Sequence, residues 1–199
     1  MAGTAKAIDA TKIHQGPGDL WIIAPAPDDT AQRLTLAADG TPDVAAHANC
    51  IHLGATMGGI TTIIQEKLSP IEIDQADGPV LHIPVGVEMR IETELAQVNV
   101  DLLQHVLALG TYSTAAGYKQ ISIGGKLAIT YLCVAAIAPK RSDPTKFIVS
   151  LLYKVLPQSG ISILMGRDKP ATNKVVFAGA NDHTRSAGRQ TGLIYETIA

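Results

Sequence analysis

The sequence predicts a mostly β protein, a sandwich with one flanking helix. Many short segments rich in β-branched and aromatic residues are separated by Gly, Pro, Asp and Asn turns, and only one segment has a helical period. Hydrophobic residues make up 46% of the 199 residues, which is enough to form a core. Many short strands with a single helix favour a sandwich or barrel architecture.

The first 48 residues are rich in Ala, Asp, Gly, Pro and Thr, with turns at "APAPDDT" and "ADGTPD". One strand-like patch, Leu20 to Ala24, lies within them. We interpret residues 1–48 as an N-terminal arm with one or two strands and residues 49–199 as the sandwich domain. From residue 50, "CIHL" and "ITTIIQ" flank "GATMGG", whose glycines permit a sharp turn or bulge.

Residues 85–95 alternate strictly, which predicts a half-buried strand with one row in the core and the other in solvent. The apolar row is Val85, Val87, Met89, Ile91, Thr93 and Leu95. The charged row is Glu88, Arg90, Glu92 and Glu94. Two carboxylates of this row could form an acid/base dyad, but a dyad also needs a pocket that raises one pKa.

Residues 99–109 change to a helical period. Asn99 is expected as the N-cap, Asp101 is favourable in the first turn, and Gly110 is expected as the C-cap. The apolar stripe expected to pack is Leu102, Leu103, Val106 and Leu107. The chain then returns to strand-like segments: "KQISIG", "KLAITYLCVAAIA", "KFIVSLLYKVL", "ISILM", "NKVVFAGAN" and "GLIYETI".

Charge and motifs argue against several function classes. Sixteen Lys and Arg against eighteen Asp and Glu give a net charge of −2, so there is no global basic field for nucleic acid. Phosphate-loop, dinucleotide and HExxH motifs do not occur. The apolar run at 127–138 is shorter than a membrane span, and the N-terminus lacks a secretory h-region. We therefore expect a soluble protein made in the cytoplasm.

The remaining candidates for chemistry are isolated side chains and one polar loop. Cys50 and Cys133 lack metal or redox spacing and are expected to be buried thiols. The loop "NDHTRSAGR" offers Asp182, His183 and Ser186 as a possible hydrolase site, although neighbours in one loop rarely have triad geometry. We expect an exposed hairpin loop there. No two histidines have metal-pair spacing; they are His14, His47, His52, His82, His105 and His183.

The order of segments resembles the major tail tube proteins of long-tailed, non-contractile bacteriophages and related prophages. The resemblance is carried by "GPGDLW", "HLGATMGGITTIIQEKLSPIEIDQADGPV", "GVEMRIETELAQ" and "VNVDLLQHVLALGTYS", and is firmest over residues 49–110. It implies a tail-tube-type β-sandwich with a flanking helix. It further implies that six copies form a ring, that the inner sheets close into a barrel, and that rings stack into a tube.

Residue by residue, the resemblance implies a lead-in strand at Ile60–Gln65, a stacking loop within Glu66–Gly86, a barrel strand at Val87–Leu95 and a flanking helix at Asn99–Leu109. The inter-ring residues would be Glu66, Lys67, Asp74, Gln75, Asp77, Gly78 and Pro79. The lumen-facing residues would be Glu88, Arg90, Glu92 and Glu94. An acidic lumen would keep DNA from adhering, and Arg90 could pair with a glutamate of a neighbouring subunit.

The implied partners are further copies of the chain, a tape-measure protein, the tail terminator and distal tail proteins, and double-stranded DNA in transit. The resemblance implies no cofactor, no metal and no enzymatic activity, and a place in the virion tail after assembly in the host cytoplasm. The sequence departs from the family in showing no obvious appended immunoglobulin-like domain, so we expect a bare tube subunit. Two alternatives remain open. One is a head decoration or other tail protein of similar sandwich fold; the other is a small β-barrel enzyme or ligand-binding module.

Overall fold

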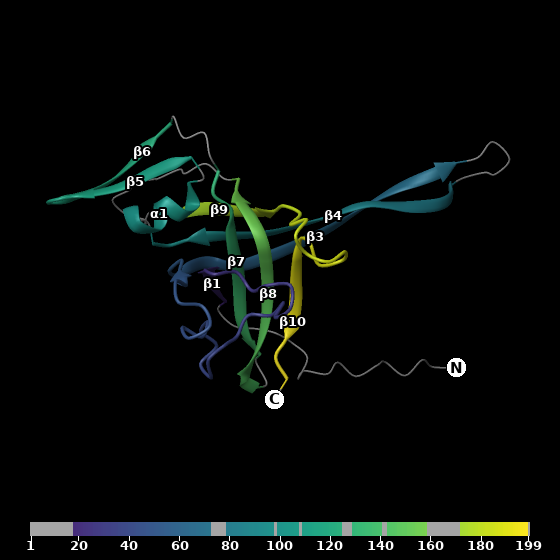
Figure 1. Cartoon of the computed structure of the whole chain (residues 1–199), viewed down its shortest axis with the longest axis horizontal. Coiled ribbons are helices and arrows are strands. Elements are labelled where there is room, and N and C mark those ends of the chain that lie inside the picture. Colours follow the sequence, from purple (N-terminus) through teal and green to yellow (C-terminus); the bar gives the residue numbers. More distant parts are fainter. Residues whose placement is uncertain are drawn as a thin grey trace.

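The computed structural model describes residues 18–72, 79–97, 99–107, 109–124, 129–140, 143–158 and 172–198. These residues form a mostly β protein with one short helix, as the sequence predicts (Figure 1). The expected strand "ISILM" lies outside them. The elements in chain order are β1 Asp19–Ile23, β2 Ile51–His52, β3 Thr56–Glu72, β4 Pro79–Leu95, α1 Val100–Val106, β5 Gly110–Ala115, β6 Tyr118–Ile123, β7 Leu132–Lys140, β8 Asp143–Pro157, β9 Asn173–Gly179 and β10 Gly192–Glu196.

The main sheet is antiparallel, with the strand order β2-β1-β7-β8-β9-β4-β3 and with β10 paired to β8. Strand β8 pairs with β10 over Ile148–Leu152 and then with β9 over Val155–Pro157. The sheet divides at this point, and β9, β4 and β3 cross the face of β1, β7 and β8 (Figure 1). The two layers make the arrangement consistent with a β-sandwich. Strands β5 and β6 form a separate hairpin beside α1.

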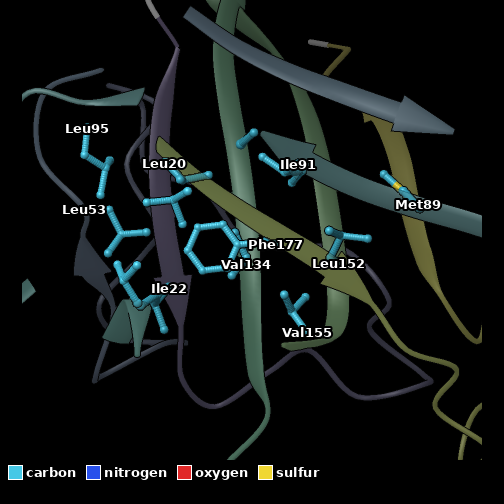
Figure 2. Packing of buried hydrophobic residues seen from close by; sticks show 13 residues of the cluster. Leu20, Ile22, Leu53, Met89, Ile91, Leu95, Val134, Leu152, Val155 and Phe177 are labelled. Atoms are coloured by element: carbon cyan, nitrogen blue, oxygen red, sulfur yellow. The ribbon is translucent and has the colours of Figure 1, made fainter. Parts of the chain in front are cut away.

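The inner core fills the space between the crossing layers. Phe177 of β9 lies at its centre, over Val134 of β7 (Figure 2). Each fully buried aliphatic or aromatic side chain contributes about 1.5–3 kcal/mol to folding. The members are Leu20, Ile22, Leu53, Met89, Ile91, Leu95, Val106, Val134, Ala136, Leu152, Val155, Val175 and Phe177.

A second apolar cluster lies on the other face of β1, β7, β8 and β10, where the segment at 24–50 covers it. Side chains alternate along β7, so that Val134 faces the inner core while Cys133 and Ala135 face this outer cluster. Leu34 of the covering segment is buried against it. The expected N-terminal strand therefore exists as β1 and lies inside the sheet, between β2 and β7. The domain boundary at residue 48 stays a prediction.

Strands β3 and β4 correct the expected stacking loop. Each contains 17 residues, and they pair from Thr56 and Leu95 out to Glu72 and Pro79. The residues expected to form a loop at 66–86 are thus mostly a long hairpin, and only 73–78 lie outside the described part. The aliphatic content of "LSPIE" and "PVLHIPV" explains why strand pairing continues. At about 3.3 Å per residue each strand is about 55 Å long, and the hairpin projects far from the body (Figure 1).

The helix begins as expected and ends earlier. Asn99 caps it by accepting a hydrogen bond of 2.8 Å from the amide of Leu102. The helix ends at Val106 with Leu107 as the C-cap, so the predicted end at residue 109 and the Gly110 cap are wrong. Gly110 instead begins β5 and pairs with Ile123, which draws the backbone into the second hairpin. Within the described residues, no helix has the length and apolar character required to cross a bilayer.

Candidate assembly interface

The outer part of the β3–β4 hairpin, residues 64–72 and 79–87, is called the arm below. Its aliphatic side chains are between 38% and 66% exposed to solvent, although they are apolar. Scattered exposed hydrophobic residues are normal, but a contiguous set on one projection indicates a contact surface. The set is Ile64, Leu68, Ile71, Val80, Leu81, Ile83, Val85 and Val87.

Both faces of the arm are apolar. Partners across an antiparallel pair share a face, so the pairing of Ile71 with Leu81 places both on the same side, which Ile83 shares two residues further along β4. Leu68 pairs with Pro84 on the opposite side, which Val80 shares by the same two-residue period. A strand pair that faces water normally has one polar face. The arm therefore has the side-chain pattern of a hairpin that is buried on both sides.

The apolar row of β4 is confirmed at four of its six residues. Met89, Ile91, Thr93 and Leu95 are buried, with exposed fractions of 6% or less. Val85 and Val87 are exposed, so their predicted place in the core is wrong, because β4 has by then left the body. Thr93 donates a hydrogen bond of 3.0 Å to the carbonyl oxygen of Gly59, which explains a polar residue in this row.

The charged row of β4 lies on the outward face of the β9–β4–β3 layer and is balanced by neighbouring lysines. Glu88 pairs with Lys67 of β3, and Glu92 contacts both Arg90, at 3.1 Å, and Lys174 of β9, at 3.5 Å. Lys174 is also the strand partner of Glu94. Two of the three carboxylates thus form ion pairs, and the third lies opposite a lysine in the strand register. The row is acidic in the sequence, but its surroundings in the fold carry little net charge.

The expected inter-ring residues are distributed along the arm. Glu66 and Lys67 lie in β3, and Pro79 begins β4. The other four, Asp74, Gln75, Asp77 and Gly78, lie outside the described residues. Lys67 therefore belongs to both the charged face and the arm. The sequence did not reveal this double role, because it depends on the register between β3 and β4.

The helix stripe divides into two halves. Val106 is buried in the inner core and Leu102 packs partly against it, as predicted. Leu103 and Leu107 instead line a groove of about 620 Å³ between α1 and β6, called the α1–β6 groove below. Its other lining residues are Val100, Lys119, Gln120, Ile121 and Ile123. The groove is mostly aliphatic, and Ile123 at its edge is 80% exposed.

One ion pair lies at the edge of this groove. Asp101 accepts hydrogen bonds from Lys119 at 2.6 Å and from the Tyr112 hydroxyl at 2.8 Å. The hydrogen bond from Lys119, and then that from Tyr112, lowers the pKa of Asp101, and the same contact raises the pKa of Lys119. Burial lowers the pKa of His105, on the neighbouring turn of α1.

The polar loop at 181–189 does not form a hydrolase triad. Asp182 accepts a hydrogen bond of 2.7 Å from the Thr184 hydroxyl, and this contact is the main cause of its lowered pKa. Ser186 donates to Asp29 at 2.6 Å. His183 is exposed and forms no hydrogen bond with any residue that the structure describes. The loop is partly exposed, as expected, but it holds one buried residue.

That residue is Arg185, which sequence reasoning missed. Its guanidinium lies 3.6 Å from the centre of the Tyr153 ring and donates to the carbonyl oxygens of Pro27 and Asp28. Its Nε atom is 3.2 Å from Asp182. Arg185 is 8% exposed. It therefore fastens the C-terminal loop to the segment that covers the outer cluster, a contact between residues about 157 positions apart.

The thiols and histidines have structural surroundings. Burial raises the pKa of the Cys133 thiol to about 12, so it stays protonated, and Cys50 packs partly against the same outer cluster. Both thiols are free. His47 is buried, with Nδ1 3.1 Å from the Pro25 carbonyl oxygen and Nε2 accepting from Thr35. The described residues contain no group of three or more His, Cys, Asp or Glu placed to hold a metal ion.

Comparison with models of protein families finds no match to the chain, and no curated protein matches it. The interpretation of the arm and the charged face therefore depends on their own chemistry.

Proposed function

We propose that the protein is the major tail tube subunit of a long-tailed, non-contractile bacteriophage or related prophage. Six copies would form a ring, and rings would stack around a tape-measure protein into a tube that conducts double-stranded DNA at ejection. Tail terminator and distal tail proteins would close its ends. The subunit would assemble in the host cytoplasm, and its place would be the virion tail.

The observation that carries the proposal is the arm. A hairpin with aliphatic residues on both faces is poorly suited to water, and burial against other copies would remove that surface from solvent. The long outer edge of β3 also supports the proposal. Strand β3 pairs with β4 on one side, and on its other side it pairs with no strand that the structure describes. A ring in which such edges pair would remove an aggregation hazard.

The charged face of β4 would line the lumen. Because Lys67, Arg90 and Lys174 balance the three glutamates there, this wall would carry alternating charges rather than a uniform acidic field. Such a surface would offer the phosphate backbone no cationic track, and affinity for DNA depends on such tracks. The low net charge of the whole face, with the lysines of β3 and β9 included, fits a conduit that does not retain its cargo.

The test is electron microscopy with light scattering on the purified protein and on a variant without the arm. Glu66 and Val87 are register partners, so an Asn-Gly turn replacing residues 67–86 would close the hairpin directly after them. We expect the parent protein to form stacked rings or tubes on concentration. The shortened variant should fold but should not stack. A compact dimer or trimer of the parent, unchanged by concentration, would instead favour a decoration protein.

A further inference from the structure

We propose that the α1–β6 groove of one copy is the receptor for the arm of the next copy. This inference rests on the proposed self-assembly and names the surface that would receive the arm. The groove and the arm are both contiguous aliphatic surfaces that the described residues leave open, and their shapes are complementary. The arm projects, whereas the groove is hollow.

The chemistry of the two surfaces matches. One face of the arm presents Ile71, Leu81 and Ile83 side by side. The groove is lined mainly by Val100, Leu103, Leu107, Ile121 and Ile123, and its volume of about 620 Å³ leaves room for several aliphatic side chains. Removing such side chains from water is favourable in proportion to their apolar area.

The charges do not oppose the contact. The arm, residues 64–72 and 79–87, contains two carboxylates and one lysine. The unit at 99–124 contains one carboxylate, Asp101, and one cation, Lys119, which lines the groove. Asp101 is already neutralised by Lys119 and bonded to Tyr112. The arm would therefore meet no unpaired carboxylate at the groove.

The arm is smaller than a full interface. It presents nine described residues on each strand, whereas a typical stable interface involves about 20–30 residues a side, so docking in one groove would be one of several contacts in the assembly. The groove receives only part of this surface. The opposite face, with Leu68 and Val80, would remain for a further neighbour, as expected for a hairpin enclosed on both sides.

The positions of the two surfaces determine the kind of assembly. In Figure 1 the end of the arm and the α1–β5–β6 unit lie at opposite ends of the molecule, so an arm cannot fold back into its own groove. A contact between two different surfaces is heterologous, and it extends from copy to copy unless a rotation closes it. Arm-in-groove docking would therefore add copies along one direction.

A chemical cross-link tests the contact. Cys50 is replaced by Ala, and Cys133 stays, because burial keeps its thiol protonated. Leu81→Cys is placed in one chain and Ile123→Cys in another, and the mixture is treated with a short bismaleimide. We expect a band shift from the monomer mass to twice that mass. The matched control is Ile198→Cys, which is 86% exposed and lies outside the groove. It should give no such band with Leu81→Cys.

The outcomes separate this inference from the proposed function. Tubes of the parent protein without the specific cross-link would overturn the docking site and leave the tube proposal intact. A specific cross-link in a protein that never forms tubes would support the docking site and count against the tube. Equal cross-linking of Ile123→Cys and Ile198→Cys would overturn the inference, because the contact would then be non-specific. Ile121→Glu with Ile123→Glu should also abolish stacking while the fold, followed by thermal unfolding, is retained.

Discussion

Arg185→Ala is expected to destabilise the monomer strongly although the residue lies in a polar surface loop. The substitution removes a buried guanidinium that contacts the Tyr153 ring, two backbone carbonyl oxygens and Asp182. It leaves the carbonyl oxygen of Pro27 without its donor, whereas that of Asp28 keeps the amide of Gln32 at 2.9 Å, and it opens a cavity over an aromatic ring. The segment that covers the outer cluster would lose its attachment to the C-terminal loop.

The contacts set the size of the effect. Hydrogen bonds to a charged group contribute about 1.5–3 kcal/mol each, and a desolvated cation–π contact adds about 2 kcal/mol. These contributions are not additive. The Asp182 side chain is 20% exposed in the folded protein, so water can replace part of the interaction that it loses with Arg185. We expect about 3 kcal/mol, at the lower end of the range for breaking a buried ion pair. For a chain of this length the melting temperature should fall by about 6–12 °C.

Urea and thermal unfolding of the monomer measure this loss, with Arg189→Ala as the matched control, because Arg189 is an exposed arginine of the same loop. Arg185→Ala should lower the midpoint while Arg189→Ala leaves it nearly unchanged. Arg185→Lys should recover only part of the loss, since one ammonium cannot reach both carbonyl oxygens and lie flat on the ring. A loss below about 1 kcal/mol, the usual value for an exposed ion pair, would refute the reasoning.

Four further predictions concern other parts of the molecule. Tyr195→Phe should cost about 1–3 kcal/mol in urea unfolding, because its hydroxyl both donates to the Leu34 carbonyl oxygen at 3.0 Å and accepts from the Leu34 amide; an unchanged midpoint would contradict this. Burial raises the pKa of Tyr195 to about 12, so ultraviolet titration should show one tyrosine that ionises well above the ordinary value of 10. Burial lowers the pKa of His105 below its ordinary 6.5, so the unfolded chain binds the proton first; stability should fall as the pH drops below about 6.5, and His105→Gln should flatten this slope. Replacing the three glutamates of the charged row by lysine should leave tubes intact but block DNA ejection; normal infectivity would count against a lumenal row. These glutamates are Glu88, Glu92 and Glu94.

The local features of the fold were accessible from the sequence. Alternation placed Met89, Ile91 and Leu95 in the core, and the N-cap role of Asn99 followed from its position before an apolar period. The same alternation failed at Val85 and Val87, because a period of two shows which residues share a face but not whether anything covers that face. The arm was expected to be a loop for a related reason. The charged turn is visible in the sequence, but the strand pairing on either side of that turn depends on the whole hairpin.

The long-range contacts of the candidate site could not be predicted. Lys67 and Lys174 neutralise the charged row through strand register, which joins residues more than 20 positions apart. Arg185 reaches Pro27 and Asp28 across most of the chain, and no local pattern marks it. Charged residues in Gly- and Ser-containing loops are normally exposed. The burial of Arg185 in such a loop is therefore only a weak hint that this residue has a partner.

The glycine bulge at the base of the hairpin determines how the arm can fold. An arm with aliphatic residues on both faces gains nothing from one register over the next, since a one-residue slip exchanges two similar faces. Gly58 and Gly59 have φ values of 75° and 88°, and the pairing shifts between Met57 and Ile60. A slipped strand would have to move this bulge and break the Thr93 hydrogen bond to Gly59, so the contacts at the body favour one register of the hairpin. The body thereby acts as the template that gives an otherwise ambiguous hairpin a single alignment.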